Sequence, residues 1–415
     1  MKEFSPFEAH PHLAIAVSGG SDSMALTLLA HHWVTIRGGR ITALVVDHAL
    51  RPESQAEANQ VRNWLHSLGI ETHILTWEGE KPRHRIQERA RQARYDLLEN
   101  WCMENQVGYL LTAHQGDDQW ETMMQRISRS SGPRGLRGIL SERSRPFGRL
   151  MRPFLVRGHH DLGIPKEEII CYLEDQGQAY INDPSNENMK YERVRWRQER
   201  ATWEQKGYTI EKIAIIMNEA ILSFAALELE YTYWALENSE VSPLGYIRIK
   251  RVEWNRCSPE LQCHIIQRIL SCFQEKPYPT PTSTLQNIRT RLQSQSAVGA
   301  GGCYFVNRSH EILVTREVRG LPKIDLQSPL SDPVIWDRFQ LIFMDNRYEG
   351  WTVEPLGQRR AEAFCAGGDY DEPSYVLASL PCLVNPNDEA NIVFIDIQDG
   401  HKDGVVGELK FGSAI

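Results

Sequence analysis

The chain has 415 residues, 41% of them hydrophobic and 24% charged, and a formal net charge of -8 at pH 7. These values are ordinary for a globular protein of two or three domains, and they exclude the disordered and fibrous classes. No run approaches the roughly 20 apolar residues that span a bilayer, and the N-terminus lacks a basic region followed by an apolar signal core, so we expect a cytoplasmic protein. The eight cysteines include no CxxC pair, which predicts reduced thiols and neither a zinc ribbon nor a disulfide scaffold.

Strand and helix signals alternate along the first third of the chain. Apolar runs with the length of buried strands are separated by segments with helical spacing, which predicts an α/β fold with a doubly wound, mostly parallel sheet. The predicted strands are 13–17, 41–51, 71–77 and 107–114, and the predicted helices are 57–70, 85–106 and 117–131, besides one that follows residues 18–23. In such sheets ligands bind at the carboxyl ends of the strands, where residues 18–23, Asp47 and His114 fall.

The character of the sequence changes after about residue 205. The next segment is predicted to be mainly helical, with a proline-rich loop at 276–283 and a hairpin at 301–317. From residue 321 onward, strand-like runs are punctuated by prolines. We therefore expect three domains, which are a nucleotide-binding domain 1–205, a helical domain 206–320, and a small C-terminal domain 321–415 of mixed or β structure.

The stretch SGGSDS follows the first predicted strand and opens a helix. It is neither a Walker A loop, because no Gly-Lys-Ser/Thr follows, nor a GxGxxG turn. Its glycines let backbone N–H groups approach an anion, its serines add hydroxyl donors, and the helix offers its positive end, so the stretch predicts a phosphate site. Asp22 could act as a Mg²⁺ ligand at this site. The alternative is a serine-glycine turn in which Asp22 only caps the helix. The candidate nucleotide-binding residues are Ser18, Gly19, Gly20, Ser21, Asp22, Ser23 and Asp47.

A second polar group, AHQGDDQWET (113–122), begins at the end of the fourth predicted strand. Asp117 and Glu121 are i and i+4 neighbours on the predicted helix, so their carboxylates share one face and could hold a metal ion or position a basic group. Asp118 lies on an adjacent row with Arg126. The alternative is a solvated cap, because the helix dipole favours acids in the first turn.

Basic residues concentrate in two stretches although the chain is acidic overall. Nine arginines lie between 126 and 157 against the single acid Glu142, and glycines and Pro133 predict a loop there, which favours contact with a polyanion. Residues 190–200 are basic again and include Trp196, which could stack on an unpaired base; the alternative is a solvated helix with Trp196 packed inward. The candidate RNA-binding residues are Arg126, Arg129, Arg134, Arg137, Arg195 and Arg197.

These motifs together carry a resemblance to a known family. SGGSDS after a buried strand is similar to the pyrophosphatase-type loop, or PP-loop, of the N-type ATP pyrophosphatases. The blocks VVDHALRPES, IQERARQARYDLL, AHQGDDQWETMMQRISRSSGPRGLRGI and YINDPSNENMKYERVRWR, in this order, resemble tRNA(Ile)-lysidine synthases over roughly residues 13–200. The chain departs from the usual pattern at Gln115 and Gly116, where histidine and alanine are more familiar, at Ser130, where glycine is, and at Ala49, where glycine is common.

The resemblance implies an adenine nucleotide alpha hydrolase-like fold and an ATP- and Mg²⁺-dependent ligase. Such enzymes adenylate the C2 carbonyl of the cytidine at the first anticodon position of the CAU-anticodon isoleucine tRNA, and free lysine then displaces AMP to give lysidine. By resemblance, residues 18–23 hold the pyrophosphate portion of ATP, the acids of the second group bind Mg²⁺ or the lysine ammonium, and a homodimer is expected. The implied catalytic residues are Asp22, His114, Asp117, Asp118 and Glu121, and the implied metal ligands are Asp22 and Asp118. The individual roles of Asp117, Asp118 and Glu121 stay open.

Three other functions are compatible with parts of the sequence. Another PP-loop enzyme that adenylates tRNA, such as a cytidine thiolase, generally needs cysteine pairs, and none is present. An amidotransferase-type synthetase acting on a small molecule would leave the arginine-rich stretch unexplained. A nucleotide-sensing RNA-binding protein without turnover would have no need of the intact acids.

Overall fold

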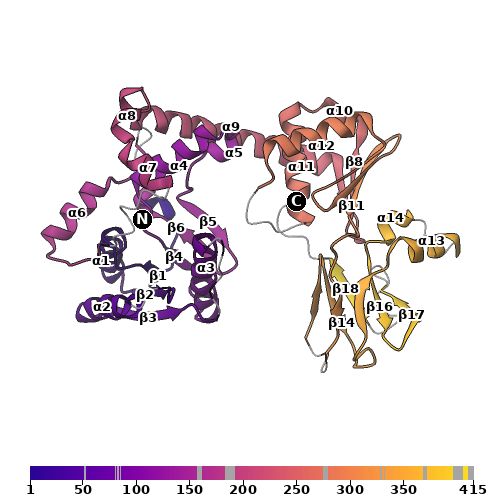
Figure 1. Cartoon of the computed structure of the whole chain (residues 1–415), viewed down its shortest axis with the longest axis horizontal. Coiled ribbons are helices and arrows are strands. Elements are labelled where there is room, and N and C mark those ends of the chain that lie inside the picture. The colour runs from indigo at the N-terminus through magenta and orange to yellow at the C-terminus, as the bar shows by residue number, and fades with distance from the viewer. Residues whose placement is uncertain are drawn as a thin grey trace. The chain divides into compact units, whose positions relative to one another are not determined.

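A computed structural model of the chain describes residues 1–50, 53–79, 81, 84, 86–156, 161–182, 192–273, 279–327, 330, 332–367, 372–395 and 405–409. The chain forms two compact units, Met1–Phe224 and Ala225–Ile415, which are coloured by residue number in Figure 1. All eight cysteines are free thiols. Among the described residues, no helix has the length and apolar character needed to cross a membrane.

The first unit is built on a six-stranded sheet of order β3-β2-β1-β4-β6-β5. All neighbouring strands are parallel except β5, which is antiparallel to β6 at the edge. The strands are β1 (His12–Val17), β2 (Arg40–Asp47), β3 (Glu71–Thr76), β4 (Tyr109–Leu111), β5 (Glu142–Arg145) and β6 (Gly148–Met151). The prediction of a doubly wound, mostly parallel sheet is therefore confirmed.

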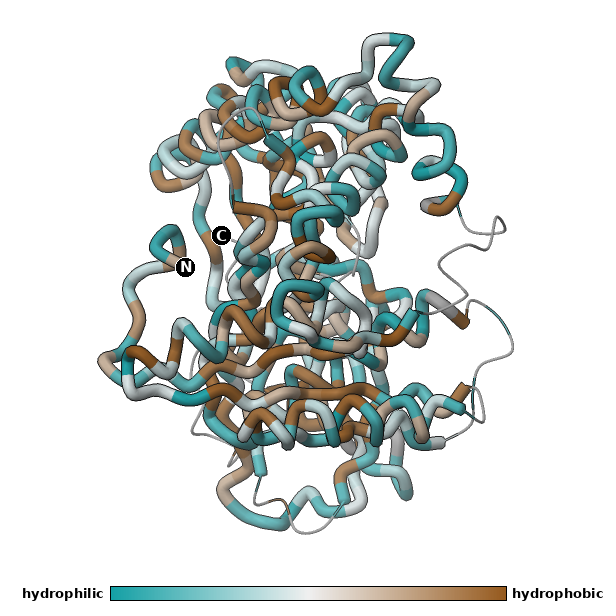
Figure 2. The backbone as a smooth tube through the Cα atoms, turned by 90° about the vertical axis from the view of Figure 1, so that its left-hand side faces the viewer, coloured by the Kyte–Doolittle hydropathy of each residue, from teal (hydrophilic) through white to brown (hydrophobic). Residues whose placement is uncertain are grey.

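Helices cover both faces of this sheet because its strands are apolar on both sides. On one face, Leu13, Ile15 and Val17 pack against α1 (Ser21–Thr35), α2 (Ser54–Ser67) and α6 (Lys166–Asp175). On the other face, Ala14 and Leu44 pack against α3 (Ile86–Glu104). In Figure 2 the hydrophobic residues, in brown, run along the strands between helices that are more hydrophilic. The alternation along β1 thus places the strand between two layers of helices.

The helix predicted at 117–131 is present as α4 (Gly116–Ser128), but the prediction of a loop for the rest of the arginine-rich stretch is wrong for most of the described residues up to 156. They include the short α5 (Pro133–Leu136) and the hairpin of β5 and β6. Leu150 and Met151 are buried beside β4, and Gly148 lets β6 approach it, since a Cβ there would lie 2.3 Å from the Gly108 carbonyl oxygen. The apolar residues that build this edge are few, so the arginines between them concealed the strand pattern.

Ala49, at the position where glycine is common in the family it resembles, lies in the left-handed region with φ of +49°. We expect Ala49→Gly to raise the free energy of unfolding by about 0.5 kcal/mol, because this conformation costs an L-residue about 1–2 kcal/mol and the extra freedom of glycine in the unfolded chain offsets about 0.5–1 kcal/mol. Urea unfolding measures the change. The control Ala56→Gly, at an exposed position of α2, should lower stability by about 1 kcal/mol, and a similar loss at position 49 would contradict the prediction.

The second unit begins within α9 (Ile210–Asn238), whose residues belong to both units. In its described residues, α9 and three further helices pack against a five-stranded antiparallel sheet of order β7-β8-β11-β10-β9. These elements are β7 (Ser239–Val241), β8 (Ile247–Lys250), α10 (Arg251–Arg256), α11 (Pro259–Phe273), α12 (Thr282–Ser294), β9 (Ala297–Ala300), β10 (Cys303–Asn307) and β11 (Glu311–Arg316). The hairpin predicted at 301–317 is present as β10 and β11, whereas the sheet around it was missed because its other strands are short.

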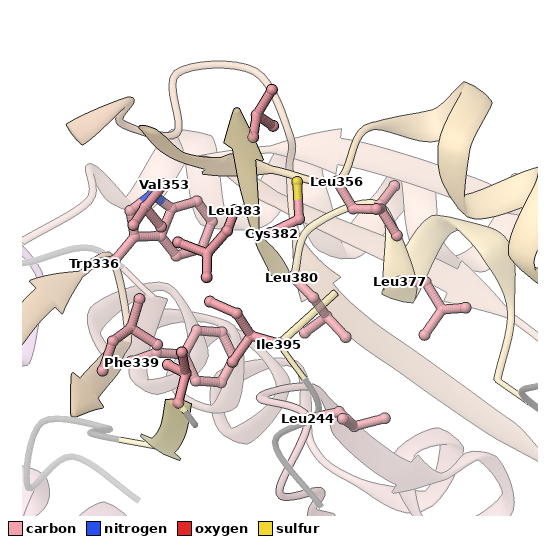
Figure 3. Close-up of a cluster of buried hydrophobic side chains, with 14 of the residues drawn as sticks. Leu244, Trp336, Phe339, Val353, Leu356, Leu377, Leu380, Cys382, Leu383 and Ile395 are labelled. Carbon is pink, nitrogen blue, oxygen red and sulfur yellow. The ribbon is translucent and has the colours of Figure 1, made fainter. Parts of the chain in front are cut away.

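The C-terminal part is mostly β structure, as predicted. Its elements are β12 (Ile324–Asp325), β13 (Val334–Trp336), β14 (Phe339–Phe343), β15 (Thr352–Pro355), α13 (Gln358–Gly367), α14 (Ser374–Leu377), β16 (Pro381–Asn385), β17 (Asp388–Phe394) and β18 (Val405–Leu409), in two antiparallel sheets. Figure 3 shows Trp336, Phe339 and Leu383 in their common core together with Leu244, which precedes β8. Buried Arg338 donates to the Gly245 carbonyl at 3.0 Å and to Asp337 at 2.9 Å. The core and this network join the C-terminal strands to the preceding sheet within one unit.

Candidate active site

The PP-loop is the turn between β1 and α1. Gly19 has a φ of +84°, and a Cβ there would lie 2.6 Å from Val61 Cγ2, so glycine is required on both counts. The buried hydroxyl of Ser23 accepts from the Ser18 N–H at 3.2 Å and donates to the Gly20 carbonyl at 2.9 Å. Ser23 therefore shapes the turn, and the first backbone N–H groups of α1 lie where the chain leaves it.

Asp22 stands in the first turn of α1 beside two other charged groups. The Lys166 Nζ lies 3.6 Å from Asp22 Oδ2. Burial raises the pKa of Asp22, the Lys166 ammonium opposes that rise, and the Asp118 carboxylate adds to it. The structure thus brings Asp22 and Asp118, 96 positions apart in the sequence, close enough to repel each other, which is the arrangement that a bound cation would relieve.

A capping box opens α4. The Gln115 side chain accepts from the Asp117 N–H at 2.6 Å, and Asp118 Oδ2 accepts from the Gln115 N–H at 3.1 Å. The Gly116 N–H donates to the Ile164 carbonyl at 2.9 Å, and a Cβ on Gly116 would lie 3.1 Å from the Gly163 carbonyl oxygen. The glutamine and glycine that depart from the usual family pattern are therefore the residues that form this cap and its close packing.

Asp117 and Glu121 form ion pairs with arginines of the helices α7 (Glu192–Gln198) and α8 (Arg200–Gln205). Arg200 Nη1 lies 2.7 Å from Asp117 Oδ1, and Arg197 Nη2 lies 2.7 Å from Glu121 Oε1. The Glu121 side chain is only 1% exposed. In the described structure, each of these two carboxylates thus contacts an arginine guanidinium. Among the described residues, no group of three or more His, Cys, Asp or Glu side chains could hold a metal ion.

His114 and Asp47 lie at the same edge of the sheet as the PP-loop. His114 Nδ1 is 3.1 Å from Thr112 Oγ1, which orients the half-buried ring. Asp47 ends β2, and its buried carboxylate accepts from the Ala49 N–H at 2.8 Å. Asp47 therefore holds the turn after β2 and faces away from bulk water.

The arginines of the stretch 126–157 differ in their surroundings. Arg126 donates to the Gly138 carbonyl at 2.7 Å and so fixes the loop after α5. Arg129 pairs with Glu192 at 2.6 Å, and the Arg137 guanidinium stacks 3.7 Å from the Phe224 ring centroid. The Arg134 side chain is exposed. Acids from distant helices, such as Glu192, thus neutralise part of a stretch that contains almost no acids itself.

The second basic stretch is described from Glu192 onward, and residues 183–191, with Lys190 and Tyr191, lie outside the described residues. Arg195 is exposed, whereas Trp196 contacts Trp203 at 5.4 Å between ring centroids and packs inward with α4. In the structure, therefore, Trp196 packs inward, as the second alternative predicted.

One charged residue of the site, Lys166, was missed by the sequence analysis. A lysine that follows a proline at the start of a helix cannot be distinguished by sequence from a solvated surface lysine.

Known proteins resemble the chain along most of its length. The PP-loop domain family matches residues 1–201. A tRNA(Ile)-lysidine synthase of Wolbachia pipientis wMel is 33% identical over 379 residues, which are 89% of this chain and 86% of that protein. The tRNA(Ile)-lysidine synthase of Orientia tsutsugamushi (strain Boryong) is 33% identical over 361 residues, which are 84% of this chain and 78% of that protein. Among solved structures, U34-tRNA thiolase NcsA from Methanococcus maripaludis has a TM-score of 0.43 and 16% sequence identity over 52% of this chain and 72% of that chain.

These matches confirm the family that the sequence motifs predicted. The match to the PP-loop domain family covers most of the first unit, including SGGSDS and the α4 acids. The two relatives extend the similarity well into the second unit. The chain therefore belongs to the tRNA(Ile)-lysidine synthase family.

Proposed function

We propose that the chain is an ATP-dependent ligase that joins free lysine to C2 of the cytidine at the first anticodon position of a CAU-anticodon isoleucine tRNA. The observation that carries the proposal is the convergence of the PP-loop and the α4 acids at one edge of the sheet, in a chain that aligns over 89% of its length with a tRNA(Ile)-lysidine synthase. The proposal includes a cytoplasmic location and, by resemblance to the family, a homodimer. It assigns ATP and catalysis to residues 1–205 and contacts with the tRNA body to 206–320 and 321–415.

The reaction has two displacement steps. In the first, the C2 carbonyl oxygen of cytidine attacks the α-phosphorus of ATP, the bond to the β-phosphate breaks, and pyrophosphate leaves. In the second, the lysine amine attacks C2, the bond from C2 to the AMP oxygen breaks, and the amine gives up a proton as AMP leaves. The backbone N–H groups of Gly19 and Gly20 and the N-terminus of α1 suit the pyrophosphate, because they offer hydrogen-bond donors and positive potential.

Asp22 and Asp118 are the residues that would hold Mg²⁺. Oxygen ligands are what this ion prefers, and the mutual repulsion and burial of the two carboxylates are costs that a divalent cation would offset. Mg²⁺ supplies neutralisation of the charge that develops on the departing pyrophosphate. We assign Asp117 and Glu121 a positioning role, since each already holds an arginine of α7 or α8.

Exposed arginines are the best candidates for contacts with tRNA phosphates. The side chains of Arg134 and Arg195 are exposed, so their positive charges lie where a phosphate backbone could reach them. We propose that both residues belong to the surface that contacts tRNA.

Arg134→Glu is expected to weaken tRNA binding at least about five-fold at moderate salt and to flatten its salt dependence, because each lost phosphate contact reduces the slope of log K against log salt by about 1. Filter binding over a series of salt concentrations measures both quantities. Arg62→Glu, the same change at an exposed position on α2, is the control and should leave the slope near that of the parent protein. An unchanged slope for Arg134→Glu would remove this residue from the interface.

Incorporation of radiolabelled lysine into acid-precipitable RNA tests the proposed function. The assay contains ATP and Mg²⁺ and compares an isoleucine tRNA transcript that carries CAU in the anticodon with the same transcript carrying UAU. We expect label only on the first transcript. Pyrophosphate release without label on either would retain the adenylation step and overturn lysine as the nucleophile, and RNA binding without pyrophosphate release would favour a non-catalytic protein.

A further inference from the structure

One segment, residues 161–182, contacts both halves of the proposed active site. The Ile181 N–H donates to the Gly19 carbonyl in the PP-loop at 2.8 Å. The Ile164 carbonyl accepts from the first N–H of α4, that of Gly116, at 2.9 Å. Between these two contacts lies α6, which begins at Lys166 and packs on α1. The segment therefore fixes Lys166 at the point where the PP-loop and α4 meet.

Lys166 is a cation held close to Asp22, one of the two proposed metal ligands. Its Nζ lies 3.6 Å from Asp22 Oδ2, and Asp118 is near enough to act on Asp22 electrostatically. The side chains of Lys166 and Asp22 are 32% and 24% exposed, so the pair is partly shielded from solvent. A charge-assisted hydrogen bond is usually about 2.7–2.9 Å long, so this contact is loose, and the flexible lysine stem can change partner at little cost.

Binding of a nucleotide and a divalent cation would reverse the charges that Lys166 meets. A cation on Asp22 and Asp118 would repel the ammonium, whereas the phosphates beside the PP-loop would attract it. We propose that Lys166 neutralises Asp22 in the ligand-free protein and becomes a phosphate-binding residue when Mg–ATP enters. It follows that the cation alone binds poorly and that its binding depends on the nucleotide. This inference rests on the proposed function only in taking ATP as the ligand of the site.

The test replaces the ammonium while keeping most of its apolar stem, in Lys166→Met. Without nucleotide, we expect Mn²⁺, detected by electron paramagnetic resonance, to bind this variant at least about ten-fold more tightly than the parent protein. With Mg²⁺, we expect α,β-methylene-ATP, measured by calorimetry, to bind at least about ten-fold more weakly, because a hydrogen bond to a charged phosphate is lost. Lys166→Arg should restore most of the nucleotide affinity, since it keeps the positive charge.

Lys212→Met is the matched control, the same substitution at an exposed position of α9, and both affinities should equal those of the parent protein. Thermal unfolding checks that the variants are folded, and Lys166→Gln replaces Lys166→Met if that variant is not. Unchanged nucleotide affinity in a folded variant would overturn the phosphate-binding role, and unchanged Mn²⁺ affinity would overturn the neutralising role. A parent protein that binds α,β-methylene-ATP but incorporates no lysine would instead overturn the proposed function and leave the Lys166 inference standing.

Discussion

Asp22→Asn is expected to lower the rate of pyrophosphate release at least about 100-fold and to leave the affinity for tRNA unchanged. The substitution removes a charged oxygen ligand from the proposed Mg²⁺ site, and the loss of metal-assisted charge stabilisation at a leaving pyrophosphate is worth about 2.7 kcal/mol or more. The Asp22 side chain is only 24% exposed, and the exposed arginines that are proposed to bind tRNA lie on other elements. The substitution should therefore not disturb the RNA surface. Pyrophosphate release in the presence of tRNA and filter binding without ATP measure the two properties separately.

Asp175→Asn is a suitable control for this experiment, because it makes the same change at an exposed position near the end of α6. It should retain the full rate. A folded Asp22→Asn protein that releases pyrophosphate at the parent rate would contradict the assignment of Asp22 as a metal ligand. A variant that loses tRNA binding as well would instead indicate that Asp22 supports the RNA surface.

Local patterns were enough to predict the parts of the site that depend on neighbouring residues. The strand, glycine turn and helix at residues 13–33 predicted the PP-loop, because the φ of Gly19 and the cap of α1 follow from a few adjacent residues. The acids at the start of α4 were predicted for the same reason. What helix positions alone left open was the partner of each acid, since a carboxylate on a helix face is compatible with a metal ion, a lysine or an arginine.

The contacts that the sequence left open join residues far apart in the chain. Arg197 and Glu121 are separated by 76 positions, and Lys166 on α6 reaches Asp22 on the neighbouring helix α1 although the two residues are 144 positions apart. Such pairs depend on how helices pack, which no local periodicity encodes. The same holds for the arginine-rich stretch, because Arg145 forms an ion pair with Glu99 on α3, far from it in the sequence. Charge counted along the sequence therefore overstated how much of this stretch is available to a polyanion.

The second large effect that we expect is on stability, and it concerns the ion pair between Arg197 and Glu121. We expect Arg197→Met to lower the free energy of unfolding by about 2–3 kcal/mol, because it removes the arginine partner of a carboxylate whose side chain is 1% exposed. The figure lies at or below the lower end of the range for buried pairs, because the Arg197 side chain is 40% exposed and partly screened by water. Urea unfolding followed by tryptophan fluorescence measures the change, since Trp120 and Trp196 lie in the core that α4 and α7 share.

Two further variants separate a structural role of Arg197 from contact with RNA. Arg195→Met makes the same change at an exposed position two residues earlier, and it should leave stability within about 0.5 kcal/mol while weakening tRNA binding. The double variant Glu121→Gln with Arg197→Met should recover much of the lost stability, because no charge is then buried without its arginine. If Arg197→Met instead matched the parent protein in stability and lost only tRNA affinity, Arg197 would be a direct RNA contact, and α7 would be held against α4 by its apolar residues alone.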